Sequence, residues 1–240
     1  MSDTAVLMRG IEKSFGTNKV LHSVDFSLKK GSIHALLGEN GAGKTTLMNI
    51  LGGVLPKDSG TIEVEGKVVN IGSTSAAKAL GIGFIHQELT LVNDLKVYEN
   101  LFLGEEIRGK FRLLNKKMML EKSKEVLDRM GVNLNPMTDV KDLNASYKQV
   151  VEIARALMRD AKIVIMDEPT ASLTDVEIDH VFTIMRSLRD QGISLVFISH
   201  KLNEVVAVCD SYTVMRNGEM VADGPVDAGI GNNVLREEYR

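Results

Sequence analysis

The stretch LGENGAGKTTLMNIL at Leu37–Leu51 decides the fold that we predict for this chain. It contains the pattern Gly-x-x-x-x-Gly-Lys-Thr from Gly38 to Thr45, which is typical of phosphate-binding loops. The apolar run Ser32–Leu37 predicts a buried strand before the loop, and Thr45–Leu51 predicts the start of a helix after it. A strand, a glycine-rich turn and a helix in this order are the context that the pattern requires.

The residue types of the loop explain how it could bind phosphate. Gly38, Gly41 and Gly43 permit backbone conformations that a Cβ disfavours, so successive N–H groups can surround an anion. The following helix adds the positive end of its dipole. We expect Lys44 to reach the β- and γ-phosphates of a nucleotide and the Thr45 hydroxyl to ligate Mg²⁺. A glycine-rich turn that binds nothing is the alternative, which the joint presence of these features disfavours.

Composition and charge narrow the class of protein. The 240 residues are 44% hydrophobic and 25% charged, which is ordinary for a soluble globular chain of one domain or a domain with a subdomain. A formal net charge of −3 gives no reason to expect nucleic-acid binding. The single cysteine, Cys209, excludes a disulfide framework and favours a reducing cytosol. We expect neither a membrane-spanning segment nor a signal peptide, because no apolar run approaches about 18 residues.

The pattern along the chain predicts an α/β fold: a P-loop NTPase core with an antiparallel β subdomain and an inserted helical subdomain. Residues 1–240 would form a single domain, with residues 88–160 as the helical subdomain. Strands are expected at Ala5–Ile11, Ser23–Leu28, Ile33–Leu37, within Gly60–Ile71, and at Ile82–His86, Ile163–Met166, Ser194–Ile198, Tyr212–Met215 and Glu219–Ala222. Helices are expected at Thr45–Leu51, Ser75–Leu80, Val97–Leu103, Met118–Met130, Lys148–Met158, Val176–Leu188 and Leu202–Val208, whereas Gly229–Arg240 shows no pattern.

Two carboxylates follow the apolar run Ile163–Met166. They are Asp167 and Glu168, and a buried strand places them at its carboxyl end, where open α/β sheets bind ligands. Asp167 could hold Mg²⁺ through water, and Glu168 could polarise an attacking water molecule. A capping pair before the helix at Val176 is the alternative, which the phosphate-binding loop disfavours.

Three more residues are candidates by position. His200 follows the strand Ser194–Ile198 and could contact a γ-phosphate, although a lone histidine is more often structural. Gln87 follows another strand and could touch Mg²⁺ or the attacking water, with no better than even support from its sequence context. Phe15, expected in a loop beside Gly16, could stack on an adenine ring or make a small core contact, and the sequence does not separate the two.

These elements, in this order, resemble the nucleotide-binding domain of ATP-binding cassette (ABC) proteins over roughly Ala5–Pro225. Within these proteins, the chain resembles most the ATPase subunit of ribose- and galactose-type sugar importers. One chain of that family usually carries two such domains, and this chain is similar to the first. The segments that carry the resemblance are GENGAGKTTLMNILGG at 38–53, IHQEL at 85–89, ENLFLG at 99–104, VEIARAL at 151–157 and DEPTASLT at 167–174.

The resemblance implies a role for each site residue. Glu168 would be the catalytic base, and His200 and Gln87 would complete the catalytic set. Phe15 would stack on adenine. The phosphates of ATP would be held by Gly38, Glu39, Asn40, Gly41, Ala42, Gly43, Lys44, Thr45 and Thr46, and Mg²⁺ by Thr45, Gln87 and Asp167.

The resemblance also implies partners and a location. ATP binding would close the chain against a second ABC ATPase domain, and the surface after Gln87 would meet the membrane permease of a sugar importer. The chain would act on the cytoplasmic face of the membrane, as a peripheral subunit that binds neither sugar nor nucleic acid. Two alternatives from other classes are a soluble ABC protein that acts on ribosomes or DNA and a regulatory sensor that binds ATP without hydrolysing it.

One segment departs from the family pattern. The signature Leu-Ser-Gly-Gly-Gln is replaced by Leu143-Asn144-Ala145-Ser146-Tyr147, and a milder departure is Thr174, where many relatives carry aspartate. In the family, this signature contacts the γ-phosphate of ATP held by the partner domain. Asn144 can still donate a hydrogen bond, but Ser146 adds a Cβ and Tyr147 adds bulk. The departure therefore puts the contact with a partner's ATP in question, and not the binding of the chain's own ATP.

Overall fold

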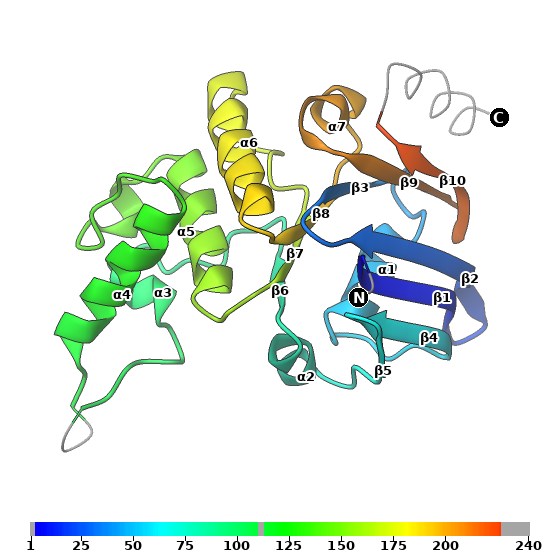
Figure 1. Ribbon diagram of the computed structural model, residues 1–240, viewed down its shortest axis with the longest axis horizontal. Coiled ribbons are helices and arrows are strands. Elements are labelled where there is room, and N and C mark those ends of the chain that lie inside the picture. Colours follow the sequence, from blue (N-terminus) through cyan, green and yellow to red (C-terminus); the bar gives the residue numbers. More distant parts are fainter. Residues whose placement is uncertain (1–2, 110–112, 227–240) are drawn as a thin grey trace.

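The computed structural model describes residues 3–109 and 113–226, which form two β-sheets and seven α-helices. The smaller sheet is antiparallel and has the strand order β2-β1-β4-β5. Figure 1 shows β1, β2 and β4 on the right, beside the second sheet. Its strands are β1 (Thr4–Phe15), β2 (Asn18–Lys29), β4 (Ser59–Val64) and β5 (Lys67–Val69).

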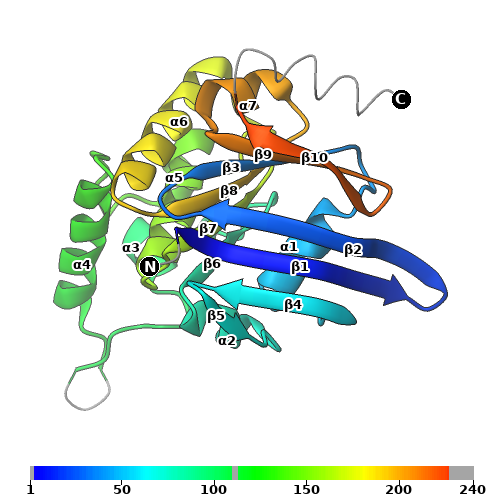
Figure 2. The same cartoon turned by 45° about the vertical axis from the view of Figure 1, so that its right-hand side comes forward.

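The larger sheet has the order β10-β9-β3-β8-β7-β6. The neighbours from β9 to β6 pair in parallel, and β10 pairs with β9 in the antiparallel sense. Figure 2 shows β3, β8 and β9 above the long strands of the smaller sheet. The strands are β3 (Ile33–Leu37), β6 (Ile82–Ile85), β7 (Ile163–Asp167), β8 (Ser194–Ile198), β9 (Ser211–Arg216) and β10 (Glu219–Pro225).

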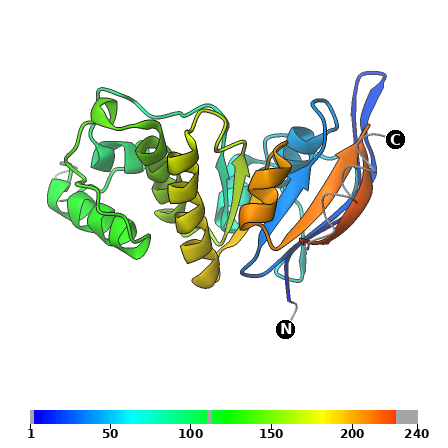
Figure 3. The same cartoon turned by 90° about the horizontal axis from the view of Figure 1, so that it is seen from above.

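The helices divide between the faces and one end of the molecule. In Figure 3 the green helices of the middle of the chain lie at one end, and the blue and orange strands lie at the other. The helices are α1 (Lys44–Leu51), α2 (Thr74–Ala79), α3 (Val97–Leu101), α4 (Lys116–Arg129), α5 (Ala145–Leu157), α6 (Asp175–Asp190) and α7 (Leu202–Val208). A short 3-10 helix at Val140–Asp142 precedes α5.

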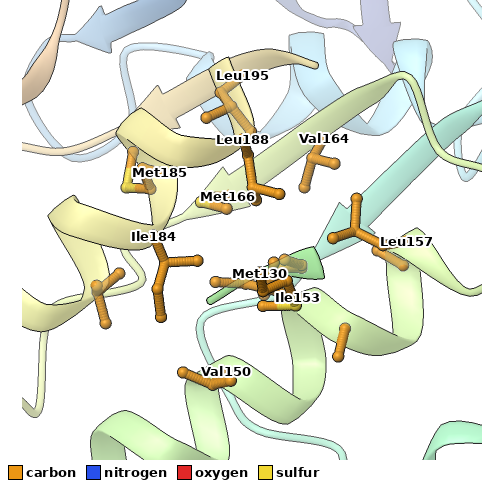
Figure 4. Packing of buried hydrophobic residues seen from close by; sticks show 14 of the residues in the cluster. Met130, Val150, Ile153, Leu157, Val164, Met166, Ile184, Met185, Leu188 and Leu195 are labelled. Atoms are coloured by element: carbon orange, nitrogen blue, oxygen red, sulfur yellow. The ribbon is translucent and has the colours of Figure 1, made fainter. Parts of the chain in front are cut away.

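The central strands are apolar on both faces because both faces are covered. In β7, Val164 and Met166 belong to the core formed with α5 and α6, whereas Ile163 and Ile165 belong to the core formed with α1 and the smaller sheet. Figure 4 shows the first core, in which side chains of α5, such as Ile153, meet side chains of α6 and β7. Strands that are buried on both faces have continuous apolar sequences, and for this reason the sequence pattern predicted their positions.

Most predicted elements are present, with differences at their ends. The largest differences are in the first hairpin, where β1 continues past Ile11 to Phe15 and β2 begins at Asn18 instead of Ser23. Phe15 pairs with Asn18 and is therefore the last residue of a strand, so its expected place in a loop was wrong. The pairing of residues 13–15 with β2 is irregular in register and has no clean alternation, which is why the pattern missed it.

Two further expectations concern larger features. The expected helix Val97–Leu103 ends at Leu101, and the boundary of a helical subdomain at residues 88–160 stays a prediction. The patternless tail at Gly229–Arg240 lies outside the described residues. Among the helices of residues 3–109 and 113–226, none combines the length and the apolar character needed to cross a membrane.

Candidate functional site

The candidate residues follow four neighbouring strands of the larger sheet. In the order β3-β8-β7-β6, the segments after the strands carry the glycine-rich loop, His200, Glu168 and Gln87, respectively. These strands are parallel, so their carboxyl ends meet at one edge of the sheet. Ligands of open α/β sheets bind at this edge.

The glycine-rich loop has the backbone that its sequence predicts. Gly38, Gly41 and Gly43 have φ angles of 141°, 86° and 100°, which side chains with a Cβ rarely adopt. A Cβ on Gly38 would lie 2.2 Å from the carbonyl oxygen of Met215 in β9, so this position also lacks space. The N–H of Gly218, in the β9–β10 turn, donates to the Ala42 carbonyl at 3.1 Å, so this turn also holds the loop in place.

Lys44 begins α1 and lies inside the loop. The residue is only 6% exposed, and Nζ donates to the carbonyl oxygens of Gly38 at 2.6 Å and Glu39 at 3.0 Å. The ammonium group is thus held at the centre of the loop by hydrogen bonds to the loop backbone. A phosphate arriving at the loop would meet a positive charge that is already in place.

The loop and the carboxylates line one cavity of about 390 Å³. Its lining combines the predicted phosphate-binding residues with Gln87, Asp167 and Glu168. The lining residues are Val20, Asn40, Gly41, Ala42, Gly43, Lys44, Thr45, Thr46, Gln87, Asp167 and Glu168. The structure therefore brings predicted site residues that follow β3 and β6, together with those at the end of β7, to a single cavity.

Asp167 and Thr45 are suited to hold a hard cation. The Thr45 hydroxyl donates to Asp167 Oδ2 at 3.4 Å, so the two oxygens are neighbours in the lining of the cavity. Burial raises the pKa of Asp167 above its usual range and the charge of Glu168 raises it further, while Thr45 and Lys44 oppose the shift. A divalent cation would relieve this excess of negative charge. Oxygen ligands of this kind fit Mg²⁺, which binds proteins through few side chains and keeps water and phosphate oxygens.

Glu168 and His200 form the second pair in the site. His200 Nδ1 lies 3.1 Å from Glu168 Oε1, and the side chains are 54% and 18% exposed, respectively. Glu168 has a φ of +46°, a left-handed conformation that is uncommon for a residue with a side chain. Its N–H donates to the Ile198 carbonyl of β8 at 3.1 Å, which ties it to the strand that precedes His200.

The carboxylate pair does not cap the following helix. The hydroxyl of Thr174, at the start of α6, contacts Glu177 Oε2 at 2.9 Å, and the Thr174 N–H donates to the same oxygen at 3.0 Å. Thr174 is therefore the N-cap residue of α6 and pairs with Glu177, without Asp167 or Glu168. The capping alternative for the carboxylates is therefore wrong.

Four of the predicted site residues, Gly38, Glu39, His200 and Phe15, do not line the cavity. Gly38 and Glu39 belong to the loop and His200 contacts Glu168, so Phe15 is the one that lies in another part of the fold. It is 47% exposed at the end of β1, where Lys13 Nζ lies 5.6 Å from the centre of its ring. The residue of this hairpin that does line the cavity is Val20 in β2, which had no sequence signal of its own. His86, which precedes Gln87, stacks on Phe84 with ring centres 4.4 Å apart and does not line the cavity.

The variant signature forms the start of α5. Asn144 Oδ1 accepts hydrogen bonds from the Tyr147 N–H at 3.0 Å and the Ser146 hydroxyl at 3.1 Å, so the asparagine caps its own helix. Ser146 is buried, and Tyr147 packs against His180 of α6 with ring centres 5.4 Å apart. The added side chain of Ser146 is therefore accommodated inside the chain, and Asn144 is the exposed member of the three.

Family comparison points to one class of protein. The family model described as ABC transporter matches residues 21–171. The ribose import ATP-binding protein RbsA of Oceanobacillus iheyensis is 49% identical over 232 residues, which cover 97% of this chain and 47% of that protein. The protein of the same name from Bacillus licheniformis is 48% identical over 216 residues, which cover 90% of this chain and 44% of that protein. The chain spans just under half the length of these relatives.

Solved structures resemble the whole chain. A nucleotide-free ATP-binding cassette from an ABC transporter superposes with a TM-score of 0.88 at 28% identity, covering 99% of both chains. The ADP conformation of an ATP-binding cassette of an ABC transporter superposes with a TM-score of 0.87 at 29% identity, covering 99% of this chain and 97% of that one. Both agree with the P-loop core and the antiparallel sheet described above.

Proposed function

Because the chain belongs to the ABC transporter family, we propose that it binds and hydrolyses MgATP and that this reaction drives sugar import through a membrane permease. The observation that carries the proposal is the shared cavity, which joins the phosphate-binding loop to Gln87, Asp167 and Glu168. The names of the relatives support a monosaccharide such as ribose as the transported sugar.

Binding begins with the glycine-rich loop. Residues 38–46 surround the phosphates with backbone N–H groups, and Lys44 supplies the positive charge at the β- and γ-phosphates. Thr45, Gln87 and Asp167 would hold Mg²⁺, which when bound neutralises charge on the phosphate oxygens. Phe15, or another side chain of the first hairpin such as Val20, would cover the adenine.

Hydrolysis then depends on Glu168 and His200. Glu168 accepts the proton of the attacking water, which forms the new bond to the γ-phosphorus as the bond to the β-phosphate oxygen breaks. His200 lies 3.1 Å from Glu168 through Nδ1, so it orients the base. Only the imidazolium form carries hydrogen on both ring nitrogens, and in that form the other nitrogen would donate to the γ-phosphate. The residues position and stabilise charge, which is most of what phosphoryl transfer requires.

Coupling requires partners. We propose that ATP closes this chain against a second ABC ATPase domain and that residues 88–160 act as a helical subdomain whose surface after Gln87 meets the permease. The chain would work at the cytoplasmic face of the membrane and contact neither sugar nor nucleic acid. A regulatory sensor is the second candidate, since the signature departs from the family pattern, but the pairing of Glu168 with His200 favours turnover.

Sugar uptake by living cells tests the proposal. In cells that depend on the full-length protein, Glu168→Gln should abolish uptake of labelled ribose, whereas Glu65→Gln in the exposed turn between β4 and β5 should leave it unchanged. If both variants took up ribose at the wild-type rate, the proposed function would be contradicted. If the protein sedimented with ribosomes instead, the ribosome-associated alternative would replace the importer.

A further inference from the structure

Glu204 in α7 is a buried carboxylate that the proposed mechanism does not use. Its exposure is 3%. Two of the residues that it contacts, Thr170 and Ser199, are exposed by only 2% and 3%, and the third, Lys201, has a side chain that is 36% exposed. Thr170 lies two residues after Glu168, and Ser199 immediately precedes His200. A carboxylate in such a place requires an explanation, because burial of a charged group is costly unless it is paired and hydrogen-bonded.

Glu204 joins two segments that are distant in sequence. The Thr170 hydroxyl donates to Glu204 Oε2 at 2.7 Å, and the Ser199 hydroxyl donates to the same oxygen at 3.2 Å. The other oxygen, Oε1, accepts from Lys201 Nζ at 3.0 Å. One carboxylate therefore links the turn after β7 to the loop after β8.

Both links act on backbone that carries a reacting group. The Ser199 hydroxyl oxygen also accepts the Lys201 N–H at 3.0 Å, and this bond joins the two residues that flank His200. Thr170 lies in the tight turn in which the Ala171 N–H donates to the Glu168 carbonyl at 3.2 Å. Glu168 has a left-handed backbone in this turn, a conformation that persists only where neighbouring contacts hold it.

We propose that Glu204 is a positioning residue for ATP hydrolysis, which holds Glu168 and His200 in register by binding Thr170 and Ser199. The inference rests on the proposed function, which assigns the roles of Glu168 and His200. An apolar residue could not replace Glu204, because it would leave two buried hydroxyl groups without an acceptor. The carboxylate supplies enough acceptor capacity for both.

Steady-state ATPase kinetics on the full chain test this role. Glu204→Ala should lower kcat by about 10- to 100-fold, the effect of misplaced reacting groups, and leave KM for MgATP nearly unchanged. Glu204→Gln should keep kcat within about threefold of wild type, because an amide oxygen can accept both hydroxyl groups. Thr170→Val, which removes one link at similar volume, carries the test if Glu204→Ala does not fold, with an expected loss of about tenfold.

Asn100→Ala is the matched control for lost stability. Asn100 is fully buried in α3 and bonds to the backbone of Val92 and Lys96, away from the cavity. This variant should unfold more easily but keep the kcat of wild type. If it loses as much kcat as Glu204→Ala, or if Glu204→Gln is as slow as Glu204→Ala, the role of Glu204 is structural and the inference is overturned.

Hydrogen exchange separates this inference from the proposed function. In Glu204→Ala, backbone amides in residues 168–173 and 199–203 should both exchange faster than in wild type, with the rest of the sheet unchanged. This readout needs no turnover. If wild type does not hydrolyse ATP, the proposed function fails, and faster exchange in both segments still supports the link through Glu204. Unchanged exchange in either segment overturns it.

Discussion

Replacing Lys44 with alanine should weaken MgATP binding by about 10- to 100-fold. In the free protein, Nζ donates to the carbonyl oxygens of Gly38 at 2.6 Å and Glu39 at 3.0 Å. When phosphate binds, these bonds are exchanged for bonds to charged oxygens. Two charge-assisted bonds contribute about 3–6 kcal/mol in total, and the exchange offsets about half of this. A net loss of about 1.5–3 kcal/mol corresponds to the stated change in affinity.

Isothermal titration calorimetry with MgATP measures this change. Lys117→Ala on α4 is the matched control, because it removes one positive charge from a side chain that is 88% exposed and far from the loop in sequence. Circular dichroism confirms that both variants are folded. Equal affinity in Lys44→Ala and wild type would refute the assignment of this loop to the phosphates, since no other residue of the loop carries a positive charge.

Two other predictions concern the signature and the core. Asn144→Ser with Tyr147→Gln, in a Glu168→Gln background, should increase ATP-dependent dimerisation in analytical ultracentrifugation; tight dimers of the Glu168→Gln single variant would contradict it. Burial lowers the pKa of His34 to about 4 from 6.5, so the unfolded state binds the proton first as pH falls. Between pH 6.5 and 4, urea unfolding should reveal a loss of about 3 kcal/mol that is absent in His34→Gln; an equal loss in both would refute this.

Local pattern located the elements that build the site. The runs at Ile33–Leu37, Ile163–Met166 and Ser194–Ile198 were predicted within a residue of the observed strands, because strands covered on both faces must be apolar throughout. The glycine-rich loop was also predictable, because the loop needs positive φ angles at set positions and glycine is the residue that adopts them readily.

What the sequence could not supply is contact between distant segments. The order β3-β8-β7-β6 brings Gln87 and Glu168 to the loop, and no periodicity specifies that order. Val20 lines the cavity because the β1–β2 hairpin extends further than its alternation indicates. Glu204 reads in sequence as an ordinary polar residue of a short helix, and its burial against Thr170 and Ser199 arises only from tertiary packing.

The rate of phosphate release from MgATP by Glu168→Gln tests the central claim most directly. Glutamine keeps the shape of the side chain but is a poor proton acceptor, so hydrolysis should fall by about 10²-fold or more while calorimetry shows unchanged MgATP affinity. Glu168 lines the cavity and contacts His200, which makes it the base in this account. A variant that releases phosphate at the wild-type rate would contradict the account and would make His200 the next candidate for the base.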